Sequence, residues 1–248
     1  MNKFVKYLSL ATLLLPLVAS SAFASGGAEI EHSGANVTDT ASLQRGAKWF
    51  ANYCQGCHAL GYMRYNRMAE DLDLSEEMTM ENLVFSAAKF GDTMDISMAA
   101  DQSIDWFGKV PPDLSLVGRS RGPDWLYSYL LSFYQDESGG WNNSLLPNAA
   151  MPHVLWQLQG IQTPVYRQET DESGFTHEVI DHFEMTTTGT QSAEEYEQTA
   201  RDLATYLQYV GEPAILQRKS LGVWVLMFLA LFTFIAYLLK VEYWRDIH

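Results

Sequence analysis

The pentapeptide Cys54-Gln55-Gly56-Cys57-His58 is the stretch from which the rest of the sequence can be interpreted. Two thiols separated by two residues, and followed directly by an imidazole, can add to both vinyl groups of one haem and ligate its iron from the same turn. This is the c-type haem attachment motif. It predicts one haem c, bound covalently through Cys54 and Cys57, with His58 as an iron ligand.

Two other kinds of site also use a Cys-x-x-Cys pair. A structural zinc site normally needs a second Cys or His pair at matching spacing, but Cys54 and Cys57 are the only cysteines of the sequence. A thioredoxin-like dithiol begins a helix that follows an apolar strand, and no strand pattern precedes Cys54. Covalent haem is therefore the favoured interpretation, with a dithiol or a metal site as the alternatives.

The first 24 residues have the pattern of an export signal. Lys3 and Lys6 precede the apolar run 7–18, and residues 22–24 (Ala-Phe-Ala) supply the small side chains of a cleavage site. We therefore expect a signal peptide over residues 1–24 and a mature chain that is translocated across the membrane. Both cysteines of this exported chain would be used by the haem rather than by a disulfide.

The charge balance limits the partners. The sequence has 16 basic and 30 acidic residues, and the signal peptide removes two of the basic ones, so the mature chain has a net charge of about −16. Nucleic acid is an unsuitable partner for such a chain, whereas a basic protein is a suitable one. Six acidic residues lie between positions 70 and 81, and this run is either a solvated surface or a docking patch for a cationic partner.

The C-terminal region contains a membrane anchor. The residues from Ser220 to Leu239 are uncharged and mostly apolar, which is long enough for a helix to span a hydrocarbon core of ~30 Å. A buried helix of a soluble domain is the alternative, but such helices are rarely apolar on every face over this length. The pattern predicts a haem domain over residues 25–217, a transmembrane helix over 218–240 and a cytoplasmic tail over 241–248.

The spacing of apolar residues predicts two long helices that should pack together. The first covers Asp39 to Tyr53 with Thr40 or Ser42 as its cap, and the second follows a capping box at Ser192. Gly211 and Pro213 should stop the second helix, with a connector through Arg218 leading to the membrane, and Gly46 could let another helix approach. The two stripes consist of Leu43, Ala47, Phe50 and Cys54, and of Tyr196, Ala200, Leu203, Leu207 and Val210.

A rigid segment, Pro111-Pro112-Asp113-Leu114-Ser115, lies between these helices. Both prolines disfavour helix, so the segment is expected to be extended. It could be a simple connector, or it could wall the haem and offer a carbonyl to the second nitrogen of His58, with Pro112 as the predicted cofactor contact. Arg119 and Arg121 follow, and Arg121 is the preferred partner for a haem propionate.

The other axial ligand must come from downstream. An aromatic-rich helix is expected over Pro123 to Tyr134 and a polar loop over Ser138 to Pro147. Met151 then lies on an irregular, proline-flanked segment that could present its sulfur to the iron, and thioether ligation would raise the reduction potential. His153 is the main competitor, and His177, His182 and Met185 are weaker ones. The region 157–189 resembles an insertion, with short strands around 163–167 and 178–183.

Together these pieces resemble the cytochrome c1 family, the haem subunits of the cytochrome bc1 (quinol:cytochrome c oxidoreductase) complex, in its bacterial form. The resemblance covers nearly the whole precursor, and its specificity comes from the order of the motifs. These are Arg45-Gly46 before the haem motif, Pro111 to Ser115 followed by Arg119-Ser120-Arg121, Met151-Pro152, and Gly211-Glu212-Pro213 before a single membrane helix.

The resemblance implies a mainly α-helical, cytochrome c-like haem domain with insertions, held on the periplasmic side of the inner membrane by one transmembrane helix. It implies His58 as the proximal ligand and Met151 as the distal ligand of the haem c iron. It also places Arg121 at a propionate and Trp125 at a haem-side position where other members carry tyrosine.

The implied function is transfer of single electrons, not catalysis by this chain alone. The implied partners are cytochrome b, the Rieske iron-sulfur protein as electron donor, a cytochrome c as acceptor, and membrane lipid. The alternative function is that of a membrane-bound haem enzyme subunit, of the peroxidase or oxidase type, with an open iron site.

Overall fold

A computed structural model describes residues 30–96, 98–170 and 174–247 of the chain. The predicted signal peptide, residues 1–24, lies outside these residues. The helices are α2 (Thr40–Trp49), η1 (Phe50–Cys54), α3 (Tyr65–Asp71), α4 (Glu76–Asn82), α5 (Ala100–Phe107), α6 (Val117–Ser120), α7 (Pro123–Leu131), α8 (Trp156–Gln159), α9 (Ala193–Gly211), α10 (Ile215–Tyr243) and η2 (Arg245–Ile247). The strands are β1 (Leu60–Arg64), β2 (Thr93–Met94), β3 (Phe133–Gln135), β4 (Trp141–Asn143), β5 (Gly160–Thr170) and β6 (Thr176–Thr188).

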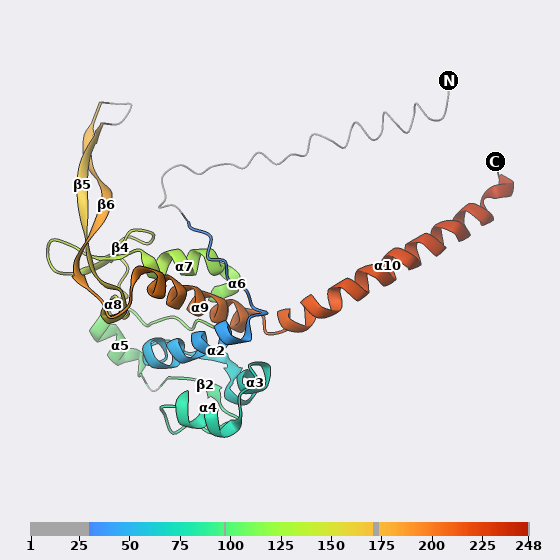
Figure 1. Ribbon diagram of the computed structural model, residues 1–248, viewed down its shortest axis with the longest axis horizontal. Helices are drawn as coiled ribbons and strands as arrows, with labels where there is room; N and C mark the ends of the chain where they lie inside the picture. Colours follow the sequence, from blue (N-terminus) through green and yellow to red (C-terminus); the bar gives the residue numbers. More distant parts are fainter. Residues whose placement is uncertain (1–29, 97, 171–173, 248) are drawn as a thin grey trace.

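The centre of the domain is the pair α2 and α9, which pack side by side as predicted (Figure 1). All members of the two predicted stripes are buried except Cys54, which is partly exposed. Gly46 allows the close approach, because a Cβ at this position would lie 2.2 Å from the carbonyl oxygen of Asp202 on α9. Asp202 is itself buried, and accepts hydrogen bonds from Ser42 (2.6 Å) and Arg45 (2.6 Å) on α2.

The ends of these two helices follow the sequence signals with one correction. The capping box of α9 is present, with the Ser192 hydroxyl accepting from the Glu195 amide and the Glu195 carboxylate accepting from the Ser192 amide. The N-cap of α2, however, is Asp39, whose carboxylate accepts from the Ser42 amide (3.1 Å). Neither Thr40 nor Ser42 is the cap, because both already belong to the helix, whereas Asp39 is the flanking residue with extended backbone.

The helix that leads into the haem motif changes its winding before the motif begins. Residues Phe50–Cys54 form one turn of π-helix, η1, directly after α2. Such turns are rare and often occur at functional sites. At the end of η1 the Cys54 carbonyl accepts hydrogen bonds from the amides of Cys57 (3.0 Å) and His58 (2.8 Å). These two bonds close the haem motif into a tight turn.

Helices α6 and α7 cover the other side of α9. The aromatic helix was predicted over Pro123 to Tyr134, but α7 ends at Leu131, and Phe133–Gln135 instead forms strand β3. This strand pairs with β4, which lies inside the stretch predicted as a polar loop. Asn143 stabilises the hairpin from within, because its buried amide donates to the Tyr129 carbonyl (2.9 Å) and its side-chain oxygen accepts from two backbone amides.

The insertion is a long antiparallel hairpin rather than a pair of short strands. β5 and β6 pair along their whole length, from Gly160 opposite Thr188 to Thr170 opposite Thr176, and the hairpin projects from the domain (Figure 1). The base of the hairpin contacts the domain, where Phe183 lies 5.4 Å from Tyr134 between ring centroids. The predicted strand positions were right, and their lengths were too short.

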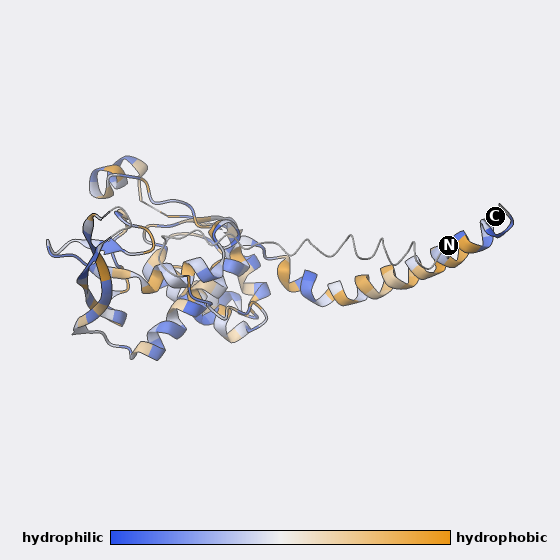
Figure 2. Ribbon diagram, turned by 90° about the horizontal axis from the view of Figure 1, so that it is seen from above, coloured by the Kyte–Doolittle hydropathy of each residue, from blue (hydrophilic) through white to orange (hydrophobic). Residues whose placement is uncertain are grey.

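Helix α10 leaves the domain, and its long middle part is apolar while charged residues lie near both ends (Figure 2). It is long and apolar enough to cross a membrane, and none of its apolar stretch is buried against the domain. The connector from α9 is shorter than predicted: α10 already begins at Ile215, and Arg218 lies within it, forming an ion pair with Glu212 (3.0 Å). The helix also continues to Tyr243, beyond the predicted end of the span at residue 240.

Candidate functional site

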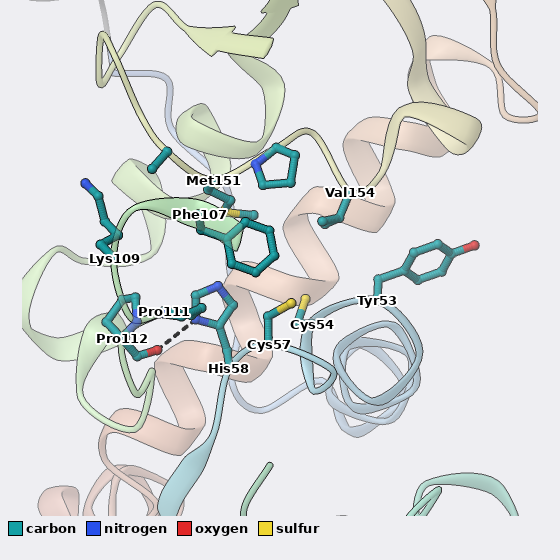
Figure 3. Close-up of a pocket in the computed structure, with 12 residues that line it drawn as sticks. Tyr53, Cys54, Cys57, His58, Phe107, Lys109, Pro111, Pro112, Met151 and Val154 are labelled. Atoms are coloured by element: carbon teal, nitrogen blue, oxygen red, sulfur yellow. Dashed lines mark hydrogen bonds between the residues drawn. The ribbon is translucent and has the colours of Figure 1, made fainter. Parts of the chain in front are cut away.

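The imidazole of His58 is oriented by the proline-rich segment. Its Nδ1 lies 2.7 Å from the Pro112 carbonyl oxygen, so Nδ1 carries the proton and Nε2 is the nitrogen left for a metal (Figure 3). Burial lowers the pKa of His58, while the Pro112 carbonyl and the Asp113 carboxylate oppose this effect. A neutral imidazole with one fixed tautomer is the form in which histidine ligates iron.

The Pro112 carbonyl is in turn held in place by hydrogen bonds between its segment and the chain after His58. The Asp113 carboxylate accepts from the Gly61 amide (2.8 Å) and from the Ser115 amide (2.7 Å). The Leu114 amide donates to the Ala59 carbonyl (2.9 Å). The segment 111–115 is therefore a structural brace of His58 as well as a connector, as one of the two sequence interpretations predicted.

The two cysteines line the same cavity as His58. Both are free thiols, and burial raises the pKa of Cys54 to about 12, with a smaller contribution from the charge of Cys57. Burial also raises the pKa of Cys57. Reactive dithiols have lowered thiol pKa values. The site therefore lacks the electrostatics of a redox-active pair and has two neutral thiols that face an apolar cavity.

Residues far apart in sequence line that cavity. Its walls include Cys54, Cys57, His58, Pro112 and Met151, with Tyr53, Phe107, Lys109, Pro111, Ala150, Pro152 and Val154 completing the lining. Figure 3 shows the cysteine sulfurs beside the His58 ring and Met151 across the space from it. The irregular segment around Met151 thus places its side chain in the same cavity as His58, and axial ligation by Met151 stays a prediction.

A second cavity of about 310 Å³ adjoins the first and shares six lining residues with it, including Cys54, His58 and Met151. Arg121 and Trp125 line this cavity, and their contact with a cofactor stays a prediction. The Arg121 guanidinium lies 5.0 Å from the centre of the Trp125 ring. Arg119 belongs to neither lining.

The other candidate ligands lie elsewhere in the described part of the chain. His153 is 3% exposed and stacks on Phe133 with ring centroids 4.9 Å apart, with Trp141 and Tyr196 against its edges. Burial lowers the pKa of His153 to about 4, so its ring is neutral at physiological pH. His153 lines neither of the two cavities. The weaker candidates His177, His182 and Met185 are on the projecting strand β6.

The acidic run forms parts of α3 and α4 and the turn between them. Asp71 is used internally, because it accepts from Arg67 (2.7 Å) and from the Tyr209 hydroxyl (2.8 Å). The other five, Glu70, Asp73, Glu76, Glu77 and Glu81, are exposed. A solvated surface and a docking patch both remain compatible with this arrangement.

Phe107 and Lys109 were not singled out by sequence reasoning, and both line the first cavity. Tyr129, one of the aromatic residues of the predicted helix, lines the second cavity, and its hydroxyl donates to the Met151 sulfur (3.6 Å), a contact that was not predicted. The only available signal was their closeness to the proline segment or to the predicted helix. Neither identifies a cavity wall, because the partners are far away in sequence.

The residues present fit a covalently bound haem c. Two neutral thiols, an imidazole with Nε2 available and a thioether sulfur share one apolar space, and an arginine lies at its edge. These are the groups that thioether attachment, axial ligation and propionate binding need. Within the described residues no group of three or more His, Cys, Asp or Glu side chains is arranged to hold a separate metal ion.

Comparison with known proteins agrees with this chemistry. The model of the cytochrome C1 family matches residues 31–247. Cytochrome c1 of Allochromatium vinosum is 47% identical, over 98% of this chain and 100% of that protein. The ammonia monooxygenase gamma subunit of Nitrosomonas europaea is 44% identical, over 99% and 100%, and cytochrome b/c1 of Bradyrhizobium diazoefficiens is 25% identical, over 85% and 34%. The chain belongs to the cytochrome c1 family, the haem-carrying electron-transfer subunits of the cytochrome bc1 complex.

Proposed function

We propose that this chain carries single electrons from a Rieske iron-sulfur protein to a cytochrome c, through one haem c linked to Cys54 and Cys57 and ligated by His58 and Met151. The observation that carries the proposal is the shared apolar cavity, which brings both thiols and both ligand side chains together from segments about a hundred residues apart. When bound, the haem supplies a one-electron ferric/ferrous couple.

The chain's own residues have three tasks in this function. The Pro112 carbonyl holds the proton on Nδ1 of His58 and thereby fixes which nitrogen faces the iron. Met151, which lies across the first cavity from His58, would help to hold the iron and would exclude water and small ligands from it, which is what an electron carrier requires. Arg121, exposed at the rim of the second cavity, offers a cation to a propionate.

The setting is the bacterial inner membrane, with α10 as the anchor and the haem domain on the periplasmic side. The length and composition of α10 support the anchor, and the signal-peptide pattern of residues 1–24 supports the orientation. Cytochrome b is the proposed membrane partner. Support for this comes from the Bradyrhizobium relative, whose name joins cytochrome b and cytochrome c1.

Two other functions are less well supported. A peroxidase or oxidase subunit needs an open iron position, but Met151 lies across the cavity from His58. The name of the Nitrosomonas relative indicates a monooxygenase subunit. The family match and the Allochromatium relative both favour electron transfer instead.

The test is an optically followed redox titration of the membrane-extracted protein, native and with Met151→His. Axial ligand identity is a strong determinant of haem potential, over a range of ~0.8 V. We expect one high-potential covalent haem in the native protein and a steep fall in the variant. An unchanged potential would remove Met151 from the iron and bring the open-site enzyme forward.

A further inference from the structure

The side chain of Tyr129 is in contact with the sulfur of Met151. Its hydroxyl donates to Sδ at 3.6 Å, a length suited to a sulfur acceptor, and both residues line the second cavity. Tyr129 comes from the last turn of α7, whereas Met151 is on the irregular segment after β4. This is therefore a contact between two separate elements, made directly at the proposed axial ligand.

The position of Tyr129 is fixed on several sides. Its ring stacks on Trp125, with centroids 4.9 Å apart and planes 10° from parallel, and meets the edge of Phe133 at 5.0 Å. Its backbone carbonyl accepts from the buried Asn143 amide (2.9 Å). Tyr129 as a whole residue is 9% exposed, so its hydroxyl cannot easily turn to solvent. Burial raises the pKa of Tyr129 to about 12, so the hydroxyl retains its proton at physiological pH.

We propose that Tyr129 is a positioning residue that orients the Met151 sulfur and tunes the reduction potential through the O–H···S hydrogen bond. The proposal rests on the proposed function, since it assumes that Met151 ligates the iron. A hydrogen bond to the thioether withdraws electron density from the sulfur, which makes Met151 a weaker donor. Weakening the donor removes more stabilisation from ferric iron than from ferrous iron. Tyr129 therefore raises the reduction potential.

This role differs from that of a residue that only fills space. Phenylalanine at position 129 would keep the stacking on Trp125 and the packing against Phe133, and would remove only the hydroxyl. The net value of one hydrogen bond corresponds to about a two- to tenfold change in an equilibrium constant. Tyr129→Phe should therefore lower the equilibrium constant for haem reduction by about two- to tenfold, where tenfold is 59 mV for one electron.

The experiment compares the native membrane-extracted holoprotein with Tyr129→Phe and Tyr127→Phe. Tyr127 is the matched control: it is on the same helix and also buried, but its ring faces the Arg201 guanidinium at 5.9 Å and lines neither cavity. Two quantities are measured, the reduction potential and the sulfur-to-iron charge-transfer absorption of the oxidised protein. The second quantity reports whether a thioether ligates the iron at all.

We expect Tyr129→Phe to have a lower reduction potential than the native protein and Tyr127→Phe to keep the native potential. Loss of the charge-transfer absorption in Tyr129→Phe alone would also support the proposal, since the sulfur would then have lost its orientation. A native potential in Tyr129→Phe, or equal shifts in both variants, would overturn it while leaving Met151 as the ligand. Absence of the absorption from the native protein would overturn both the proposal and the ligation by Met151.

Discussion

The substitution Gly46→Ala would test the packing that carries the haem motif. Gly46 lies in α2, where it faces α9. A Cβ there would be 2.2 Å from the Asp202 carbonyl oxygen and 2.6 Å from the Tyr206 Cβ, whereas ordinary contacts begin at 3.4 Å. The two helices would have to separate by about 1 Å.

Two effects of opposite sign decide the result. Alanine inside a helix is favoured over glycine by about 0.5–1 kcal/mol. Forcing extra volume into a packed interface costs about 1–3 kcal/mol, and the separation would also stretch the hydrogen bonds of Ser42 and Arg45 to Asp202. We expect the cost of the steric clash to exceed the gain in helix propensity, with a net loss of about 2 kcal/mol in the free energy of unfolding.

The assay is thermal unfolding of the detergent-extracted holoprotein. For a domain of this size, a loss of ~2 kcal/mol corresponds to a fall in Tm of about 4–8 °C. Gly91→Ala is the matched control, because a Cβ at Gly91 would meet nothing within 4 Å, and its Tm should stay close to that of the native protein. A Tm for Gly46→Ala at or above the native value would refute the reasoning, since helix propensity would then outweigh the contact.

Three further predictions concern single polar groups. Tyr209→Phe removes the hydroxyl that donates to Asp71 at 2.8 Å from a fully buried ring, so chemical denaturation should show a loss of about 2 kcal/mol, and an unchanged midpoint would contradict this. Ser192→Ala removes the N-cap of α9 and should cost about 1 kcal/mol in the same assay, and a stability equal to that of the native protein would count against this. The hydroxyl and amide of Ser33 hold the pKa of Asp124 below its usual 3.8, so Asp124 stabilises the fold fully above pH 3.8 and loses this effect as the pH falls through its lower folded value. Asp124→Asn should therefore be less stable than the native protein at pH 6 and approach it at pH 3, and an equal difference at both pH values would argue against the linkage.

The helical core could be predicted from the sequence because its signal is repeated. The stripes of α2 and α9 each contain several apolar residues at helical spacing, and the capping box at Ser192 marks a helix start without tertiary information. The choice of Asp39 as the cap of α2 could not be predicted in the same way, since Asp39, Thr40 and Ser42 are all good caps. Only the backbone conformation selects one of them.

The hairpin and the end of α7 were harder to predict, for physical reasons. β5 and β6 project into solvent, so most of their side chains are exposed and show little alternation of polar and apolar residues. Their length comes from pairing with each other. The aromatic residues Phe133 and Tyr134 continue the composition of α7, but they are buried as part of the hairpin with β4.

The candidate site was predictable where one motif carries the chemistry. The pentapeptide identified the thiols and His58, and the two prolines predicted an extended segment whose carbonyl reaches His58. The contact of Tyr129 with Met151 spans 22 residues, and that of Asp113 with Gly61 spans 52. Such pairs have no spacing rule, because the fold alone brings them together.

The central claim is that His58 and Met151 occupy both axial positions of the haem iron. The most direct measurement is the absorption spectrum of the reduced, membrane-extracted protein with and without carbon monoxide, for the native chain and for Met151→Ala. We predict no change for the native protein and a carbon monoxide complex for Met151→Ala, because only the variant has an open position. Ready binding by the native protein would contradict the account, since an open iron site is incompatible with Met151 as a ligand.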